Sequence, residues 1–419
     1  MRPRVTAENL SAGLILCFAL TVVSCRKSQQ NTTNDTPLDL PAGSAAVTSA
    51  VNQFALNSWR QTLQIEPAET NILISPLSIS LALDMTYNGA AGATADSMAA
   101  ALQLSGIPLS ELNAVSHAIL QQIPKEDSKV QLSIANAIWY RQTGPQPAAA
   151  FLDTISKSYQ GAAQGLDFSN PSAITTINNW VARNTENKIP QIVQSIAPSE
   201  IMFLVNALYF NGAWLHGFQT SATQPDEFHL SNGNTVNVPF MNAQVSLAMH
   251  SDSTFTVVEL PYGSGKAFDM YLLLPKANTQ PINTFAATLD ATTLENTIAG
   301  LDTQQITLSM PKWEYSYSVN NMEAELAALG MGIAFGNDAN FTTMYPSGST
   351  AISRVIHKTY IQVSETGTVA AAATGVVIMT SAPPPPPLIK FDHPFVYLIR
   401  EKQTGLILFI GIVNDPSKN

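Results

Sequence analysis

The chain contains little cysteine, little charge and no long apolar run after its first residues, and each shortage excludes a class of protein. Only two of the 419 residues are cysteines, which excludes a small disulfide-rich scaffold. Charged residues make up 12% of the chain, and the net charge is −10. No basic cluster stands out, so we expect no nucleic-acid partner.

Motifs that carry enzymatic chemistry are also missing. The sequence has no Gly-x-Ser-x-Gly, no His-Glu-x-x-His and no paired-cysteine metal motif. The segment Gly263–Ala267 resembles a phosphate-binding loop only superficially, because the first-glycine spacing and the following Ser or Thr are absent. The histidines show no metal-ligand spacing. The sequence therefore predicts a protein that is not an enzyme and needs neither metal nor cofactor.

The pattern of the N-terminal residues indicates an export signal. Arg2 and Arg4 precede an apolar run, residues 12–23, that is too short to span a bilayer. The small residue Ser24 then stands directly before Cys25, an arrangement that resembles a bacterial lipoprotein signal. This resemblance implies a signal peptide over residues 1–24 and lipidation of Cys25; an ordinary signal peptide cleaved nearby is the alternative.

The other cysteine, Cys17, lies inside the signal, so the expected mature chain keeps one thiol, at the cleavage point. Residues 25–46 are polar and are expected to form a disordered tether. We therefore expect a protein exported across the inner membrane and lipid-anchored to the bacterial outer membrane. It would face the periplasm or the cell exterior, with the lipid as its sole membrane contact.

Residues 47–419 show no second linker and no repeat, and they predict one mixed α and β domain. Helices are expected at Val51–Leu63, Pro76–Tyr87, Asp96–Leu102, Leu109–Gln122, Ala148–Tyr159, Ile174–Thr185 and Asn320–Leu329. Strands are expected at Asn71–Ser75, Gln131–Tyr140, Met202–Phe210, Thr254–Leu260, Asp269–Leu274, Gln305–Pro311, Ser353–Val363, Phe395–Arg400 and Leu406–Val413. Because these strands are apolar on both faces, helices should cover the sheets.

The most informative segment is residues 365–387. Fifteen residues from Thr368 to Ala382 carry no charge and no proline, and five prolines follow at once. Small and β-branched residues suit a chain that is sometimes an exposed loop and sometimes a central strand. The prolines would end such a strand, because proline donates no ladder hydrogen bond. An alanine-rich linker is the simpler alternative.

Nine sequence blocks resemble the signatures of the serpin family and follow its order. The hinge-like run begins at Glu365 and continues through Gly367, Thr368 and the alanines Ala370, Ala371, Ala372 and Ala373. The other blocks are Asn71–Ser80, Asn88–Thr94, Asn179–Ile189, Leu204–Trp214, Glu259–Tyr262, Met310–Lys312, Val355–Lys358 and Asp392–Phe395. The resemblance covers roughly residues 47–416.

The resemblance implies an α+β serpin fold, with three β-sheets covered by about eight or nine helices and an exposed reactive-centre loop at about residues 366–390. It also implies a hinge at the residues just named and a "shutter" of buried polar groups under the main sheet. The shutter residues would be Ser75, Ser78, Asn206 and His357. Trp214 would lie at the "breach", where the loop first enters the sheet.

The implied function is suicide inhibition of a protease. The inhibitor would be a monomer, and the target protease would be its partner. The loop would be cut, would stay acylated on the protease and would insert into the sheet. Counting from Gly367 places the reactive bond at Ser381–Ala382, with bonds at Met379 and Thr380 as rivals. The small residues suggest elastase-like or subtilisin-like serine proteases. A papain-like cysteine protease target, and a non-inhibitory serpin that acts as a surface binding protein, remain alternatives.

Overall fold

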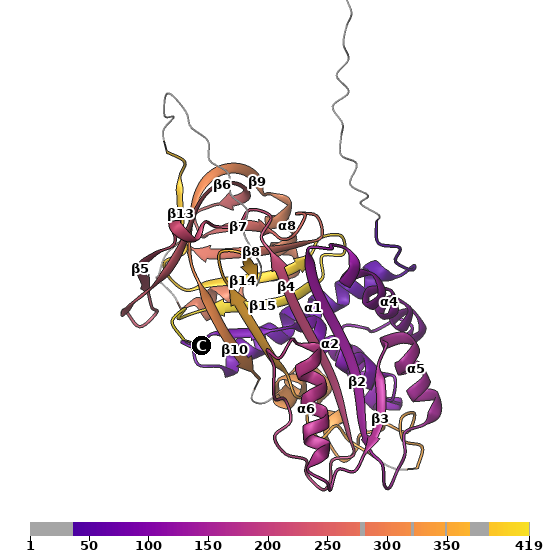
Figure 1. Ribbon diagram of the computed structural model, residues 1–419. Helices are drawn as coiled ribbons and strands as arrows, with labels where there is room; N and C mark the ends of the chain where they lie inside the picture. The colour runs from indigo at the N-terminus through magenta and orange to yellow at the C-terminus, as the bar shows by residue number, and fades with distance from the viewer. Residues whose placement is uncertain (1–36, 277–280, 320–321, 348–349, 369–384, 419) are drawn as a thin grey trace, which may run out of the picture. The chain divides into compact units, whose positions relative to one another are not determined.

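The computed structural model describes residues 37–276, 281–319, 322–347, 350–368 and 385–418. Nine α-helices occur within these ranges (Figure 1): α1 (Ser44–Ile65), α2 (Pro76–Tyr87), α3 (Gly92–Ala101), α4 (Leu109–Gln122), α5 (Ala149–Tyr159), α6 (Ser172–Asn184), α7 (Ile282–Ala287), α8 (Ala291–Ala299) and α9 (Met322–Leu326). Helix α2 begins where its sequence predicts, because Ser75 Oγ accepts the Ser78 N–H and Pro76 occupies the first turn.

Fifteen strands lie in the same ranges: β1 (Ile72–Ile74), β2 (Val130–Arg141), β3 (Ala162–Leu166), β4 (Met202–Ala213), β5 (Gln224–His229), β6 (Thr235–Ser251), β7 (Phe255–Pro261), β8 (Phe268–Pro275), β9 (Asp302–Pro311), β10 (Trp313–Ser318), β11 (Lys358–Val363), β12 (Gly367–Thr368), β13 (Leu388–Lys390), β14 (Phe395–Glu401) and β15 (Ile407–Val413). Short 3₁₀ or π segments connect some of these elements.

These strands form three sheets. The largest follows the order β1-β15-β14-β8-β7-β6-β9-β13, and β5 pairs with the long strand β6. The second sheet has the order β12-β4-β2-β3, and the third consists of β10 and β11. Pairs are antiparallel except β2 with β3 and β13 with β9.

Helices cover both faces of the β4–β2 sheet. Helix α6 lies on the outer face, where Ile177 and Val181 pack in a small core with Phe203 and Val205 of β4 (Figure 1). Helix α2 lies under the inner face, and Leu208 belongs with it to the main core. The alternation along β4 therefore separates even-numbered side chains, which face α2, from odd-numbered ones, which face α6.

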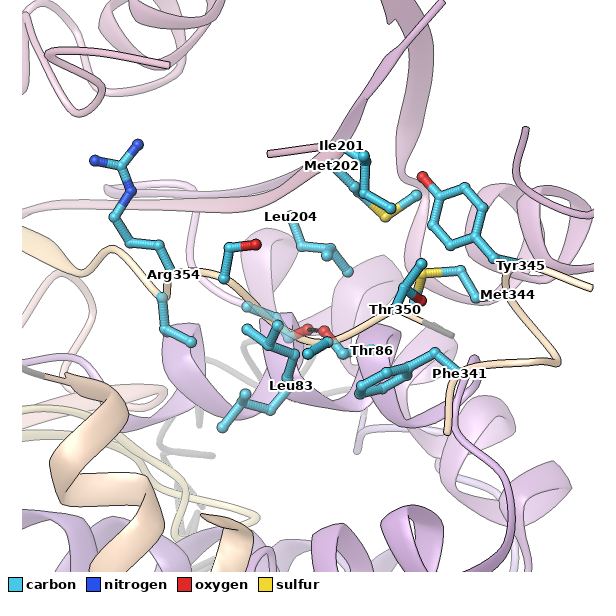
Figure 2. A pocket seen from close by; sticks show the side chains of 15 residues that line it. Leu83, Thr86, Ile201, Met202, Leu204, Phe341, Met344, Tyr345, Thr350 and Arg354 are labelled. Carbon is cyan, nitrogen blue, oxygen red and sulfur yellow. Dashed lines mark hydrogen bonds between the residues drawn. The ribbon is translucent and has the colours of Figure 1, made fainter. Parts of the chain in front are cut away.

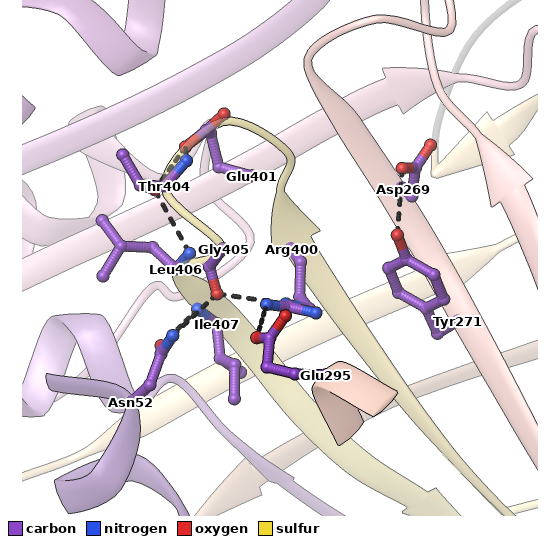
Figure 3. Close-up of polar contacts among 10 residues, drawn as sticks. All are labelled: Asn52, Asp269, Tyr271, Glu295, Arg400, Glu401, Thr404, Gly405, Leu406 and Ile407. Carbon is purple, nitrogen blue, oxygen red and sulfur yellow. Dashed lines mark hydrogen bonds and ion pairs between the residues drawn. The ribbon is translucent and has the colours of Figure 1, made fainter. Parts of the chain in front are cut away.

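Helix α1 is fastened to the hairpin of β14 and β15 by polar contacts (Figure 3). The Asn52 side chain donates to Gly405 O at 2.8 Å and accepts the Ile407 N–H at 3.0 Å. Arg400 donates to the same carbonyl at 3.0 Å and pairs with Glu295 of α8. Gly405 has a φ of 72°, which suits glycine in this turn. The two strands predicted at Phe395–Arg400 and Leu406–Val413 are present and pair antiparallel across this turn.

Most predicted elements are present, but several boundaries were wrong. The first helix begins at Ser44, not Val51, because Val47, Thr48 and Ala50 are also buried. The helix predicted to begin at Asp96 begins at Gly92.

The strand predicted over Ser353–Val363 is regular only from Lys358, because the preceding residues line an open cavity instead of pairing. The helix predicted at Asn320–Leu329 is regular only over Met322–Leu326 and then loosens into a π turn, where Gly330 has a φ of 105°.

Candidate functional site: a slot between two strands

Strands β4 and β11 are both neighbours of the short strand β12, yet no ladder joins β4 to β11 in the residues that the structure describes. Gly367 and Thr368 of β12 pair antiparallel with Ala213 and Gly212 of β4. On the other side, Ser364, which directly follows β11, forms an antiparallel bridge with Gly367. The described part of the predicted hinge, residues 365–368, therefore lies at the mouth of a slot between two strands that run in the same direction.

A tight turn over residues 364–367 holds the hinge in this position. Ser364 and Gly367 exchange both backbone hydrogen bonds, at 3.0 and 3.1 Å. The Glu365 carboxylate accepts from Lys312 Nζ at 2.9 Å and from Thr223 Oγ1 at 2.9 Å. Burial alone would raise the pKa of Glu365, but the hydrogen bonds from Lys312 and Thr223 hold it below its usual value. Glu365 is therefore ionised, and it connects the base of the hinge to Lys312 and Thr223.

Position 367 requires glycine for two reasons. Its φ is 128°, which L-residues with a side chain rarely adopt, and a Cβ there would lie 2.2 Å from Gly212 O. The next residue, Thr368, is buried, and its hydroxyl shares a hydrogen bond of 2.9 Å with the hydroxyl of Tyr262. The Thr368 side chain is thus already inside the slot.

Trp214 lies at this mouth, where the sequence resemblance placed the breach. Its ring stacks on Tyr262 with centroids 4.5 Å apart and an interplanar angle of 18°. The indole N–H donates to Ser364 O at 2.9 Å, and the backbone N–H of Trp214 donates to Thr366 O at 3.1 Å. Sequence reasoning missed Tyr262 as a functional residue, although it ends one of the recognised blocks.

The four predicted shutter residues come together below the mouth. Ser75 donates its backbone N–H to His357 Nε2 at 3.0 Å. Ser78 Oγ donates to Asn206 Oδ1 at 2.5 Å, which links α2 to β4. The Asn206 amide donates in turn to Asn136 Oδ1 of β2 at 2.7 Å. Asn136 was not predicted, and only its register opposite Asn206 could have indicated it.

A cavity of about 60 Å³ opens below the shutter (Figure 2). Met202 and Leu204 of β4 line one side, and Ser353 and Val355 line the other. Helix α2 contributes further lining residues, among them Leu83. The slot is therefore unfilled in its lower part and lined mainly by apolar groups.

Acid should weaken the fold through His357. Burial lowers the pKa of His357 to about 3, so the folded protein keeps it neutral while the unfolded chain protonates it below about 6.5. Its contribution to stability is therefore complete above pH 6.5 and falls as the pH drops from there toward 3.

We expect His357 alone to lower the free energy of unfolding by about 2 kcal/mol between pH 7 and pH 5. Urea unfolding at both pH values should show this loss in the wild type, while His357→Gln, which keeps an acceptor for Ser75, should lack it. An identical pH dependence in both proteins would contradict the assignment.

Several predicted site residues fall outside the described residues. These are the hinge alanines Ala370, Ala371, Ala372 and Ala373, the reactive-bond candidates Met379, Thr380, Ser381 and Ala382, and the lipidation site Cys25. Within the described ranges, no group of three or more His, Cys, Asp or Glu side chains is placed to hold a metal ion. No helix in those ranges is long and apolar enough to cross a membrane.

Comparison with known proteins identifies this arrangement. The family model described as serpin (serine protease inhibitor) matches residues 49–416. Serpin-Z7 of Hordeum vulgare is 34% identical over 366 residues, which cover 84% of this chain and 91% of the relative. Alpha-1-antiproteinase of Rattus norvegicus is 28% identical over 419 residues, which cover 98% of this chain and all of the relative.

Solved structures agree. The native state of Tengpin, a thermophilic serpin, superposes with a TM-score of 0.80 at 31% identity, covering 88% of this chain and 94% of Tengpin. Human thyroxine-binding globulin complexed with thyroxine gives 0.80 at 28% identity, covering 90% and 100%. The chain belongs to the serpin family, a family of protease inhibitors that are generally not enzymes. The predicted serpin fold is confirmed.

Proposed function

We propose that this serpin is a suicide inhibitor whose cut loop becomes a new central strand between β4 and β11. One observation carries the proposal: Thr368 is already buried between these strands, paired to β4 and hydrogen-bonded to Tyr262. Insertion then needs no new entry point, because the strand has only to lengthen along partners already in place.

The register of the hinge predicts where each loop residue would go. The inserted strand would run antiparallel to β4 and β11. Each further loop residue would therefore face a residue one position earlier in both of these strands. Starting from Thr368 opposite Gly212, Thr374 would face Asn206 on β4. Starting from Gly367 opposite Ser364, the same Thr374 would face His357. Both sides independently bring a hydroxyl to the shutter, where it could bond these two side chains.

In the same register, the inserted strand would bring two apolar side chains into the unfilled lower part of the slot. Val376 would lie between Leu204 and Val355, and Ile378 would lie between Met202 and Ser353. All four neighbours line the cavity below the shutter. Filling a cavity of this kind with aliphatic side chains stabilises the inserted state.

The proposed chemistry is that of an interrupted peptide hydrolysis. The protease nucleophile attacks the Ser381 carbonyl carbon, the bond to the Ala382 nitrogen breaks, and that nitrogen leaves as a protonated amine. Ser381 remains esterified to the enzyme. The fourteen residues from Thr368 to Ser381, at about 3.3 Å each, carry it roughly 46 Å along the sheet before water completes the reaction.

The target class follows from the residues around the bond. Ser381 and Ala382, with Met379 and Thr380 as rivals, are small or apolar, which fits elastase-like or subtilisin-like pockets. Neither Lys nor Arg occurs between Thr368 and Pro387, so trypsin-like enzymes should cut poorly. A papain-like cysteine protease would form the corresponding thioester and remains the second candidate target.

A protease panel tests the proposal directly. We expect an elastase or a subtilisin to form a complex with the protein that survives SDS, together with a released peptide that begins at Ala382 or within two residues of it. Trypsin, as the matched control, should form no complex. Complete cleavage without any complex would identify a substrate and would contradict the inhibitor proposal.

The alternative is a non-inhibitory serpin that acts as a surface binding protein. Human thyroxine-binding globulin, by its name a binding protein, shares the fold, so the fold alone does not separate the two functions. The uncharged loop favours inhibition, because none of the residues that would face inward carries a charge that burial would penalise.

For localisation, we propose lipidation of Cys25 and anchoring to the outer membrane. The support is the spacing of Arg2, Arg4, the short apolar run and Ser24-Cys25. Mass spectrometry of the N-terminal peptide of the membrane-extracted protein would detect the lipid.

A further inference from the structure

One edge of the long strand β6 has no partner strand over its middle part. Phe240 pairs with β5 on one edge and with β9 on the other. Met249 pairs with β9 in the same ladder and with β7 on the opposite edge, so β7 lies on the edge that β5 occupies. Between these two positions, only β9 pairs with β6 among the residues that the structure describes. Residues 241–248 therefore have one free edge, between β5 and β7.

The backbone of Gln244 and Ser246 points toward this free edge. Thr307 of β9 donates its N–H to Pro387 O, on the β13 side of β9. Thr307 stands opposite Gln244, and the two residues of such an antiparallel pair direct their N–H and C=O groups away from each other. Ser246 points the same way as Gln244, because direction alternates along a strand. Within the described ranges, no ladder and no other backbone hydrogen bond reaches these four groups.

The sequence of this edge has none of the usual protections against pairing with another chain. Exposed edges are commonly blocked by charged side chains, by proline or by a bulge. Residues 241–248 contain no charged residue and no proline, and the register between β6 and β9 runs through them without a shift. The edge can therefore accept a further strand.

An open pocket of about 780 Å³ lies along the edge. Strand β6 contributes Gln244 and Val245 to its lining, and the connection that follows β4 contributes Trp214 and Leu215. Leu215 is one of three large apolar side chains that are exposed in the described residues. The volume falls within the range of about 300–1,000 Å³ that is usual for ligand pockets. The pocket therefore offers both backbone groups and apolar surface to an extended chain.

The titratable residues in the lining are basic. They are Lys129 and His216, and both are exposed. No Asp or Glu occurs among the described lining residues, although the whole chain has a net charge of −10. Two nearby carboxylates are bonded elsewhere: Glu365 pairs with Lys312, and Asp127 accepts from Ser264. The charge of the pocket therefore favours an acidic occupant.

We propose that the free edge of β6 binds an extended, acidic peptide segment of a partner protein. The segment adds a strand between β5 and β7, exchanges hydrogen bonds with Gln244 and Ser246, and places carboxylates near Lys129 and His216. Because Thr366 lines the same pocket, the bound segment lies beside the base of the hinge. The inference does not depend on the inhibitor proposal, since it concerns binding to the uncut protein.

Fluorescence anisotropy with a labelled synthetic peptide tests the binding. The probe is an octapeptide of alternating valine and glutamate, and the protein is the purified full chain. We expect saturable binding that weakens as the salt concentration rises. The matched peptide with lysine in place of glutamate should bind at least about tenfold more weakly.

Two substitutions at one position test the backbone pairing. Gln244→Pro removes the outward N–H but no hydrogen bond to β9, so the fold should persist, as its Tm would show. We expect it to weaken peptide binding by about tenfold or more, whereas Gln244→Thr, which keeps the N–H, should change binding by less than about twofold. Lys129→Gln tests the charge separately and should weaken binding by about threefold or more.

Amide hydrogen exchange gives a readout on the unmodified protein. Bound peptide should slow exchange at Gln244 and Ser246 by about tenfold or more, because their N–H groups become hydrogen-bonded. Exchange at Ala243 and Val245 should change little, since their N–H groups already face β9.

Four results would overturn the inference. They are no saturable binding up to about 1 mM peptide, equal binding of the two peptides, equal binding by Gln244→Pro and Gln244→Thr, and unchanged exchange at Gln244 and Ser246. Dimerisation of the pure protein that Gln244→Pro abolishes would assign the edge to a second copy of this chain and would also overturn it. The protease panel reports on the proposed function, so the two proposals can fail separately.

Discussion

The Ala370→Arg variant should be cut as a substrate instead of forming the covalent complex, whereas Val369→Arg should remain an inhibitor. In the register that starts at Thr368, residue 370 would face inward, between Phe210 and Ile361, which are both almost fully buried. Residue 369 would face outward, between the partly exposed Asn211 and Gln362. The two substitutions add the same side chain to neighbouring positions, so they form a matched pair.

The expected size of the effect follows from the cost of burying a charge. An unpaired guanidinium between two apolar side chains costs several kcal/mol, which slows insertion by at least about 100-fold while deacylation continues. The yield of SDS-stable complex should fall accordingly for Ala370→Arg and change by less than about threefold for Val369→Arg. If both variants form the complex equally well, the loop does not insert in this register.

Cutting the loop should also make the protein much more resistant to heat. An inserted strand would form about ten or more ladder hydrogen bonds at roughly 1 kcal/mol each and would bury Val376 and Ile378 in the cavity. A net gain on the order of 10 kcal/mol corresponds to an increase in Tm of at least about 10 °C for a domain of this size.

Calorimetry before and after limited cleavage between Ile378 and Ala382 measures this change. Cut Ala370→Arg is the control, because burying its guanidinium costs several kcal/mol of this gain, so its Tm should rise clearly less than that of the cut wild type. An unchanged Tm for the cut wild type would mean that no strand had formed, and the trapping mechanism would have to be abandoned. The uncut protein is therefore expected to persist for kinetic reasons rather than as the most stable state.

The sequence predicted a hinge at Gly367 and a shutter residue at Ser75 because each prediction depends on a local run of residue types. Gly367 is required by its own backbone angle, and Ser75 caps the helix that follows it. Asn136 could not be predicted, because its role depends on standing opposite Asn206 in a different strand. The same holds for Tyr262, whose ring position under Trp214 depends on two segments distant in the chain.

Some elements were missed for the same reason. The strands β5, β6 and β10 carry polar residues on exposed positions, and only their partners make them strands. The cavity below the shutter also has no signal in the sequence. It arises because β4 and β11 are separated where they pack on α2. In the sequence, each lining residue looks like an ordinary buried residue of the core.

The sequence by itself determined the family and an uncharged segment long enough to serve as a strand, and it predicted the hinge, since these properties depend on residue type and spacing along the chain. Only the tertiary structure decided how Gly367 and Thr368 pair with β4 and which residues meet around Ser75, Ser78 and Asn206. These depend on contacts between residues that are 70 to 282 positions apart, and no local pattern records which of them meet.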